Sequence, residues 1–361
     1  MFDFNEHTHK RLNLLTGEWI LVSPHRTKRP WNGKTEDPAV DRMPEYDPQC
    51  YLCPGNTRAG GINNPKYEDT FLFVNDFSAL IPGIPKGDIN EDDLLIAKSE
   101  EGICKVICFS PRHDLTLARM EPAKIVNVIN LWIDQYKELG ADPKINYVQI
   151  FENRGAIMGC SNPHPHGQIW SSQSVPDLPE KETVKQTEYR QSKGHCLLCD
   201  YLDLELRKKE RIVLENDSFV VLVPFWAVWP YEVMTLPKRH MTSIDEMTEK
   251  EKKDLAGIMR ATGIRYDNLF KTNFPYSMGI HQKPTDGKAH DEWHFHFHYL
   301  PPLLRSATVR KFMVGYELLG MPQRDITAEQ AAQKLREQPS VHYLDNWTVF
   351  PQSQKCDPAA P

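Results

Sequence analysis

The chain has 361 residues, with 43 Lys and Arg against 49 Asp and Glu, so its formal net charge is −6. A net negative charge is a poor match for a nucleic-acid backbone, which excludes nucleic acid as the main ligand. The 8 Trp, 13 Tyr and 15 Phe residues exclude an intrinsically disordered chain, because such chains lack the aromatic residues that build a core. The length fits two domains of ordinary size or one large domain.

A membrane protein is also excluded. The longest strongly apolar stretch without charge lies between Asp217 and Glu232, which is shorter than the roughly 20 residues of a membrane-spanning helix. The N-terminus is acidic and has no apolar signal core. We therefore expect a cytoplasmic protein whose thiols stay reduced.

The first half of the chain contains two clear strand patterns and one helix. The apolar run 71–77 and the Val-, Ile- and aromatic-rich run 146–151 predict strands. Between them, Pro122 suits the first turn of a helix, and apolar residues then recur at three- and four-residue steps until Gly140. After this half, the stretch 176–195 is rich in Glu, Lys, Gln and Pro and has no periodicity, so we predict a linker there.

The second half follows the same plan. An apolar run at 219–225 predicts a strand, and Thr248 with Glu251 forms a capping box at the start of a helix. A further helix is expected to begin at Thr327, with Gln330 in its first turn. These patterns predict an α+β fold with antiparallel strands and one helix for each half.

Four of the eight cysteines form two Cys-x-x-Cys pairs, and each pair opens the same series of features. In a reducing compartment such pairs indicate metal ligands or redox motifs before structural disulfides. Each series continues with an apolar strand, a Pro-containing element that ends in His, a helix and a His-x-His cluster. The spacing from the histidine of the Pro-containing element to the first histidine of the cluster is 51 residues in the first half (His113 to His164) and 54 in the second (His240 to His294). The repeat predicts two modules, at 1–178 and 190–350, followed by a disordered tail at 351–361.

The segment 151–168 carries the sharpest pattern. Strand alternation places His164, His166 and Gln168 on one face, each about 7 Å from the next. A polar row on a β-rich segment is unfavourable to bury unless it is used. The preceding loop contains Gly155, Gly159 and Ser161, and small residues of this kind let backbone N–H groups approach a phosphate.

This segment resembles the active-site motif of the galactose-1-phosphate uridylyltransferase family, a branch of the histidine-triad superfamily. Four further segments carry the resemblance, at 19–31, 74–77, 274–279 and 301–317, and together they span most of residues 8–345. The resemblance implies duplicated histidine-triad-like modules, each with an antiparallel sheet that forms a half-barrel flanked by helices. It also implies a ping-pong exchange in galactose metabolism, in which UDP-glucose and galactose 1-phosphate give UDP-galactose and glucose 1-phosphate.

In this reaction His166 would attack the α-phosphorus and form a uridylyl-histidine. The chemistry is reasonable because an imidazole with an ordinary pKa near 6.5 is largely neutral at pH 7. The leaving group is a phosphate monoester with a second pKa of roughly 6, so it departs without a general acid. Gln168 can donate to a phosphoryl oxygen but cannot activate water as a base. Hydrolases of the superfamily carry a third His at this position, so Gln168 favours transfer over hydrolysis.

Three sets of residues are candidate metal ligands. Cys50 and Cys53 have zinc-pair spacing, and the resemblance adds His113 and His164 as a zinc site beside the nucleophile. It also implies a second site for iron or zinc, with the ligands Glu182, His281, His296 and His298. By the internal repeat, we hypothesise an additional zinc site at Cys196, Cys199, His240 and His294. The alternative for the latter two cysteines is that they only pack in the core.

The resemblance further implies substrate contacts and a homodimer. The uracil and ribose contacts would be Asn75, Asp76 and Phe77, and the phosphate contacts would be Asn153, Gly159, Ser161 and Gln168. The sugar-side contacts would be Lys311, Phe312, Val314, Tyr316, Glu317 and Gln323. Arg26 and Arg29 would come from the neighbouring subunit, where a guanidinium can bind two pyrophosphate oxygens.

Two other functions are open at this point. One is a related nucleotidyl-histidine transferase or phosphorylase that acts on ADP-sugars or dinucleoside polyphosphates. The other is a non-catalytic zinc-binding module that binds a partner. Covalent labelling of the protein by UDP-glucose, lost when His166 is removed, distinguishes these functions from the uridylyltransferase.

Overall fold

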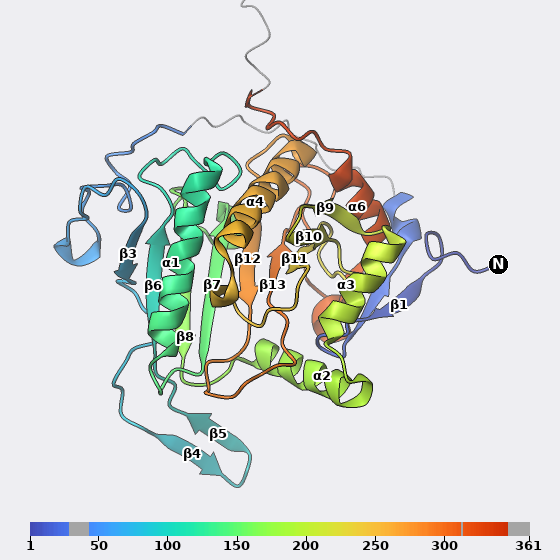
Figure 1. Cartoon of the computed structure of the whole chain (residues 1–361), viewed down its shortest axis with the longest axis horizontal. Helices are drawn as coiled ribbons and strands as arrows, with labels where there is room; N and C mark the ends of the chain where they lie inside the picture. Colours follow the sequence, from blue (N-terminus) through green and yellow to red (C-terminus); the bar gives the residue numbers. More distant parts are fainter. Residues whose placement is uncertain (29–42, 312, 346–361) are drawn as a thin grey trace, which may run out of the picture.

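The structure is a computed structural model that describes residues 1–28, 43–311 and 313–345 (Figure 1). Within these residues, nine strands form one antiparallel sheet in the order β3-β6-β8-β7-β12-β13-β11-β10-β9. The first half of the chain supplies β3 (Phe71–Val74), β6 (Gly102–Cys108), β7 (Tyr147–Arg154) and β8 (His166–Ser172). The second half supplies β9 (Ile212–Glu215), β10 (Phe219–Leu222), β11 (Val233–Pro237), β12 (Tyr276–His281) and β13 (His296–Leu300).

The two halves contribute strands in the same order, counted outward from the centre of the sheet. The order is β7, β8, β6, β3 on one side and β12, β13, β11, β10 on the other. The helices α1 (Pro122–Gly140) and α4 (Glu249–Phe270) occupy equivalent places in the two series, before β7 and β12. The two edge strands, β3 and β9, do not pair with each other, so the sheet is open and not a closed barrel. The predicted α+β fold with an antiparallel sheet is confirmed.

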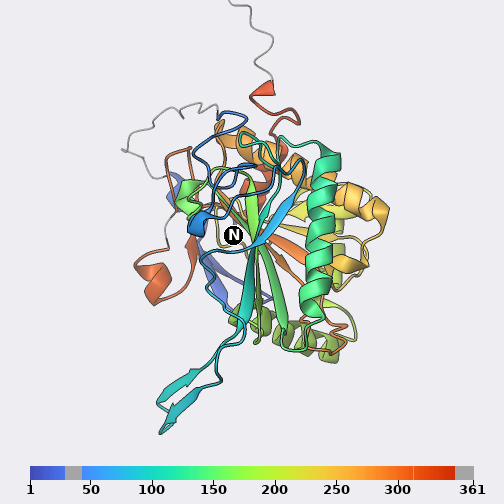
Figure 2. The same cartoon turned by 90° about the vertical axis from the view of Figure 1, so that its left-hand side faces the viewer.

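The predicted helices are confirmed with their ends. Helix α1 runs from Pro122 to Gly140, and its buried apolar residues recur at helical spacing. The capping box of Thr248 and Glu251 is present at the start of α4. A second capping box, at Thr327 and Gln330, starts α6 (Ala328–Arg336). Figure 2 shows α1 and α4 on the same face of the sheet.

The predicted linker at 176–195 is wrong. The structure has α2 (Asp177–Lys193) there, followed at once by α3 (Leu197–Lys208), whose N-cap is Cys196. The buried residues of α2 are Pro179, Glu182 and Gln186. Because this buried face is polar, the helix has no apolar stripe by which its sequence could be recognised.

The remaining elements lie around the main sheet. A three-stranded sheet consists of β1 (His9–Leu12), β2 (Trp19–Val22) and β14 (Gln323–Arg324), and β4 (Asp88–Glu91) pairs with β5 (Leu95–Lys98) in a hairpin that projects from the body (Figures 1 and 2). The short helices are η1 (Pro24–Lys28), η2 (Ala59–Gly61), η3 (Ala156–Met158), η4 (Ile244–Glu246) and α5 (Tyr316–Leu319). No helix within the described residues is long and apolar enough to span a membrane. The predicted disordered tail, 351–361, lies outside the described residues.

Strands β7 and β12 join the two halves at the centre of the sheet. Their side chains also bond across this seam: the Tyr276 hydroxyl donates to Glu152 at 3.0 Å, and Ser277 donates to Asn153 at 2.7 Å. Burial raises the pKa of Glu152 from 4.5 to about 7, even though Arg154 opposes the shift. The carboxyl group is therefore protonated in the folded chain at pH values where it is ionised in the unfolded chain.

We expect Glu152→Gln to stabilise the protein at high pH. As the pH rises from about 4.5 to 7, Glu152 ionises in the unfolded wild-type chain but stays protonated in the folded one, which lowers the free energy of unfolding. A glutamine does not ionise, so the variant avoids this loss. At pH 8 the variant should be more stable by about 1–3 kcal/mol, and at about pH 4, below the ordinary pKa of the carboxyl group, the difference should nearly vanish. Thermal unfolding at both pH values checks this, with the exposed Glu68→Gln as control. An equal shift at both pH values would contradict it.

Candidate active site

The candidate active site begins with the alternation of side chains along β8. Ile169 lies in the core that α1 covers, whereas His166, Gln168 and Trp170 belong to the other face. Gly167 lies between the first two of these and has no room for a side chain. A Cβ atom there would come within 2.8 Å of the Phe109 ring and 2.9 Å of the Phe151 carbonyl oxygen. The glycine therefore lets β8 pack closely, so that His166 and Gln168 lie side by side on the open face.

A cavity of about 450 Å³ lies over this face, within the ~300–1,000 Å³ typical of small-molecule sites. Its wall comes from the loop at residues 50–59, called the Cys50 loop below, and from the end of β3, the end of β7, the loop after β7 and the start of β8. The lining residues are Tyr51, Leu52, Ala59, Phe73, Asn75, Asp76, Phe77, Val106, Asn153, Gly159, Cys160, Ser161, His166, Gly167 and Gln168. All predicted uracil, ribose and phosphate contacts thus line one cavity together with His166.

The His166 ring is held by its own backbone neighbourhood. Its Nδ1–H donates to the His164 carbonyl oxygen at 2.8 Å, which leaves Nε2 without a proton. Burial lowers the pKa of His166, and the backbone hydrogen bond offsets part of that effect. Burial favours the neutral imidazole and the hydrogen bond fixes its tautomer, which together give the form a nucleophile requires.

The Gln168 amide has a defined orientation. The indole N–H of Trp170, which can only donate, bonds to Gln168 Oε1 at 3.0 Å, and Asn75 Nδ2 donates to the same oxygen at 3.4 Å. The oxygen of Gln168 is thereby occupied and its NH₂ group is free to donate. Asn153 is arranged similarly, because its Oδ1 accepts from Ser277 Oγ at 2.7 Å. The described part of the site thus offers two amide donors near His166, and the carboxylate that lines the same cavity, Asp76, is paired with Arg58.

The other end of the cavity is lined by aromatic and acidic residues. The ring of Phe77 is 83% exposed, so it presents a bare face at the rim. Asp76 forms an ion pair with Arg58 at 3.2 Å, and the Arg58 guanidinium lies 3.8 Å from the centre of the Phe73 ring. The pair holds Asp76 in place at the cavity wall while it keeps free acceptor capacity for a hydroxyl group.

The predicted sugar-side residues do not line this cavity. Tyr316, Glu317 and Gln323 line a second hollow of about 300 Å³, together with Arg26. Lys311 pairs with Glu317 and donates to Gln323 at 3.3 Å.

Tyr316 and Glu317 belong to α5, and Gln323 belongs to β14 of the small sheet. The small sheet and β3 lie at opposite sides of the molecule (Figure 1). Val314 is exposed and lines neither hollow. Arg29 and Phe312 lie outside the described residues. Within the described part of one chain, the predicted substrate contacts therefore form two separate groups.

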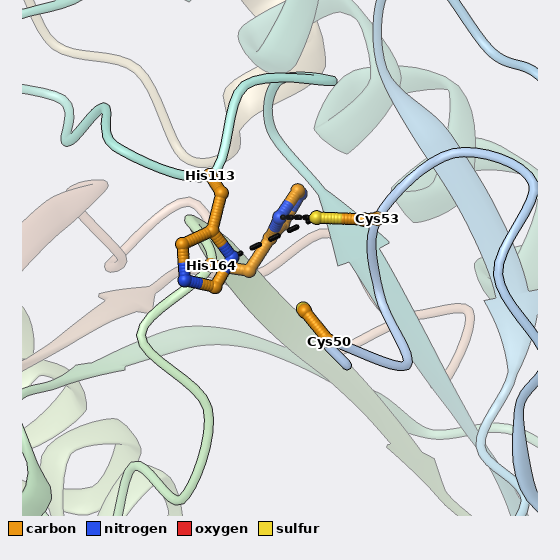
Figure 3. Close-up of side chains that lie close together, drawn as sticks. All are labelled: Cys50, Cys53, His113 and His164. Carbon is orange, nitrogen blue, oxygen red and sulfur yellow. Dashed lines mark hydrogen bonds between the residues drawn. The ribbon is translucent and has the colours of Figure 1, made fainter. Parts of the chain in front are cut away.

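The first predicted metal set forms a buried cluster. The ligand atoms of Cys50, Cys53, His113 and His164 all lie within 4.8 Å of one another. Figure 3 shows both imidazoles turned toward Cys53, and their Nδ1 atoms lie 3.7 and 3.6 Å from its Sγ. His164 Nε2 donates to the Ser110 carbonyl oxygen at 2.8 Å, which keeps Nδ1 free as a ligand. Two thiols and two imidazoles in this arrangement fit a tetrahedral zinc ion.

The second predicted set is also brought together, in the other half of the sheet. The Nδ1 atom of His281 lies 2.9 Å from Glu182, and the Nε2 atoms of His296 and His298 are 3.1 Å apart. Burial would raise the pKa of Glu182, but the neighbouring imidazoles outweigh it and hold that pKa far below its usual range. Burial lowers the pKa of His296 to about 3. An ionised carboxylate beside three imidazoles is a donor set that fits a divalent cation such as iron or zinc.

The third predicted set, Cys196, Cys199, His240 and His294, has its ligand atoms within 4.8 Å of one another as well. Unlike the first cluster, it reaches the surface, since His240 is exposed and Cys199 is partly exposed. The alternative in which these cysteines only pack in the core does not account for the two imidazoles beside them.

The sequence prediction missed two residues of the site. Trp170 lies on the same face of β8 as His166 and Gln168, so the period-two alternation would have found it if extended by one step. Arg58 has no such signal, because only the folded Cys50 loop brings it to Asp76.

The family models for galactose-1-phosphate uridyl transferase match almost the whole chain, the N-terminal domain at residues 1–176 and the C-terminal domain at residues 182–347. The chain belongs to the galactose-1-phosphate uridylyltransferase family. The enzyme of that name from Haemophilus influenzae is 50% identical over 345 residues and covers 96% of this chain and 98% of its own. The one from Saccharomyces cerevisiae is 50% identical over 359 residues, with 95% and 98% covered.

A solved structure described as a uridylyltransferase has a similar fold. It superimposes with a TM-score of 0.72 at 26% sequence identity, and the match covers 91% of this chain and 97% of that one. The resemblance stated from the sequence motifs is thus confirmed across both halves of the chain.

Proposed function

We propose that this member of the family is a UDP-glucose–hexose-1-phosphate uridylyltransferase, a nucleotidyltransferase of galactose metabolism. The observation that supports it most is the position of His166, whose free Nε2 belongs to a cavity shared with two amide donors and an aromatic rim. Relatives at about 50% identity over nearly the whole chain carry this activity in their names, which does not favour ADP-sugars or dinucleoside polyphosphates.

The proposed reaction has two displacements at one phosphorus atom. Nε2 of His166 attacks the α-phosphorus of UDP-glucose, the bond from that phosphorus to the bridging oxygen breaks, and glucose 1-phosphate leaves with the electron pair. A phosphate oxygen of galactose 1-phosphate then attacks the same phosphorus, the P–N bond breaks, and UDP-galactose leaves. No proton must be added to either leaving group, which agrees with the lack of an acid bonded to His166 among the described residues.

Gln168 and Asn153 are proposed to hold the phosphoryl group. Their amide oxygens are occupied by Trp170 and Ser277, so their NH₂ groups can donate to the non-bridging oxygens in both displacements. Gly159 and Ser161 would add loop contacts at the same group. Because neither amide can take a proton from water, the uridylyl-histidine would last until a sugar phosphate arrives.

Asn75, Asp76 and Phe77 are proposed to bind the nucleoside. Phe77 would stack on the uracil ring, and Asp76 would accept from a ribose hydroxyl while Arg58 holds its carboxylate. The face of an aromatic ring accepts any base, so the polar groups around Asn75 would be needed to select uridine.

The metal ions are proposed to be structural. Zinc at Cys50, Cys53, His113 and His164 would link the cavity-lining loop that follows Cys50 to the backbone just before His166. An iron or zinc ion at Glu182, His281, His296 and His298 would join α2 to β12 and β13. When bound, each cation supplies positive charge that holds its donors together, and the proposed displacements need no metal as a reactant.

The two groups of substrate contacts suggest a homodimer. Arg26 is half-exposed and pairs with Asp325 at 3.1 Å, next to the hollow that contains Glu317. If two copies associate so that this hollow of one faces the His166 cavity of the other, all proposed contacts meet, with Arg26 and Arg29 contributed across the interface. The division into modules 1–178 and 190–350 and the cytoplasmic location are proposed as well; the seven described cysteines are all free, which suits a reducing compartment.

We expect mixed dimers of two inactive variants to recover activity. A His166→Gly chain lacks the nucleophile but keeps the hollow, whereas an Arg26→Ala/Glu317→Ala chain keeps the nucleophile. In a heterodimer one of the two sites would be intact, because it takes its parts from different chains. Co-expression with two affinity tags and assay of the doubly tagged dimer checks this, with doubly tagged His166→Gly dimers as control. A heterodimer as inactive as its parents would place the whole site within one chain.

The proposed function is tested by incubating the protein with UDP-glucose and galactose 1-phosphate and measuring glucose 1-phosphate release. We expect product only when both substrates are present, since each displacement needs its own partner. Parallel reactions with ADP-glucose, with and without inorganic phosphate, test the related transferase and phosphorylase. Faster turnover of ADP-glucose would overturn the uridine assignment, and inactivity with every nucleotide would leave a binding module.

A further inference from the structure

We propose that Cys196, Cys199, His240 and His294 bind a zinc ion, in addition to the two metal sites above. The four residues come from three places in the fold: the start of α3, the segment after β11 and the segment before β13. Their ligand atoms lie within 4.8 Å of one another, and Cys199 Sγ is 3.3 Å from His294 Nδ1. Two thiolates and two imidazoles are a typical structural zinc set.

Both imidazoles present the same nitrogen to the thiols. His294 Nε2 donates to the Pro237 carbonyl oxygen at 3.1 Å, and His240 Nε2 donates to the Trp293 carbonyl oxygen at 2.8 Å. In each ring the proton is therefore on Nε2, and the lone pair of Nδ1 is left for a metal. Hydrogen bonds of this kind orient metal-bound histidines in proteins and raise their basicity.

The arrangement repeats a key hydrogen bond and the ring spacing of the first cluster. In both, the histidine just before β8 or β13 donates from Nε2 to the carbonyl oxygen of the residue three positions before the other histidine, which is Ser110 in one half and Pro237 in the other. The ring centres of the two histidines are 5.6 Å apart in the first cluster and 5.5 Å apart in this one. A metal ion bound in each half accounts for four donors of the same types being held in the same way on both sides of the sheet.

This ion would position the neighbouring cluster. The His294 backbone N–H donates to Gln186 of α2 at 3.2 Å, and its carbonyl oxygen accepts from His296 Nδ1 at 2.8 Å. Fixing the His294 side chain therefore fixes the backbone to which α2 and the His296 ring are both bonded. The proposed zinc would therefore hold α2, α3 and the start of β13 in place relative to one another.

Exposure distinguishes this site from the first cluster. All four residues of the Cys50 cluster are buried, whereas His240 is exposed and Cys199 is partly exposed. A chelator can reach the metal from the His240 side without unfolding the chain. We therefore expect this zinc to be released in a separate, faster phase than the other metal ions.

The test is the metal content of the full-length protein, measured for the wild type, Cys196→Ser/Cys199→Ser and His240→Asn. We expect the double variant to contain one zinc ion less per chain than the wild type and to lack the fast phase of zinc release to a colorimetric chelator. His240→Asn keeps both cysteines and changes an exposed side chain, so it should fold normally and release one zinc ion still faster. The matched control is His195→Ala, an exposed histidine beside the cluster, which should keep the full zinc content.

Because the readout is a difference between variants, it does not depend on how many metals the other clusters hold or on catalytic activity. An unchanged zinc content in the double variant, or an unchanged rate of zinc release in His240→Asn, would overturn the proposal. A Cys196–Cys199 disulfide in the purified wild-type protein, detected by peptide mass analysis, would also overturn it, because oxidised cysteines cannot bind zinc.

Discussion

His166→Gly is expected to lower the rate of glucose 1-phosphate formation by at least about 10⁴-fold, because it removes the atom that bonds to phosphorus in both displacements. The cavity would keep its amide donors and its nucleoside end, so UDP-glucose should still bind. The loss should therefore appear in kcat, with a much smaller change in the dissociation constant of UDP-glucose. Steady-state kinetics and calorimetric titration measure the two quantities separately.

The structure offers a control for this variant. His195 is an exposed histidine outside the cavity, and His195→Gly should leave the rate unchanged. A His166→Gly protein that is folded, binds UDP-glucose and retains a tenth of the wild-type rate would show that another residue is the nucleophile.

Gln168→Glu should produce the second largest loss, about 10²–10³-fold in kcat/KM for UDP-glucose. One carboxylate oxygen can still accept from Trp170, so the side chain should keep its position. The other oxygen then replaces an N–H donor and brings negative charge against an anionic phosphoryl group. The initial rate of the first displacement, followed as glucose 1-phosphate release in a single turnover, measures the effect.

Gln168→His gives the matched comparison, because an imidazole can donate to the phosphoryl group and can also take a proton from water. We expect this variant to retain more transfer than Gln168→Glu and to release more UMP from UDP-glucose than the wild type does. Equal transfer rates for Gln168→Glu and the wild type would show that the amide does not contact the phosphoryl group.

The duplicated architecture places two histidines in equivalent positions with different environments. His166 and His296 each donate from Nδ1 to the carbonyl oxygen two residues earlier, at 2.8 Å. The Nε2 of His166 belongs to an open cavity, whereas that of His296 is fully buried and lies 3.6 Å from Glu182. The same backbone hydrogen bond thus holds the proposed nucleophile in one half and a proposed metal ligand in the other, and Glu182 of α2 lies beside the latter alone.

Much of the site could be predicted because its signals are local. The alternation along β8 places His166 and Gln168 on one face without knowledge of the fold, and the repeated spacing of Cys and His residues indicates the clusters. Capping residues such as Thr248 define helix ends in the same local way.

The features that sequence could not predict depend on distant contacts. Helix α2 buries Glu182 and Gln186 against polar partners, so its sequence has the composition of a linker. The hollow that contains Arg26 and Gln323 exists only because β14 pairs with β2. A residue-by-residue resemblance assigns these residues to a substrate, but only the fold shows that they lie apart from the His166 cavity within one chain.

The most direct measurement of the central claim is the intact mass of the protein after incubation with UDP-glucose alone. We predict a covalent adduct of one uridylyl group per chain, which maps to His166, disappears on addition of glucose 1-phosphate and does not form in His166→Gly. A wild-type protein that transfers uridylyl groups at full rate without any adduct, or an adduct of equal yield in His166→Gly, would contradict the account.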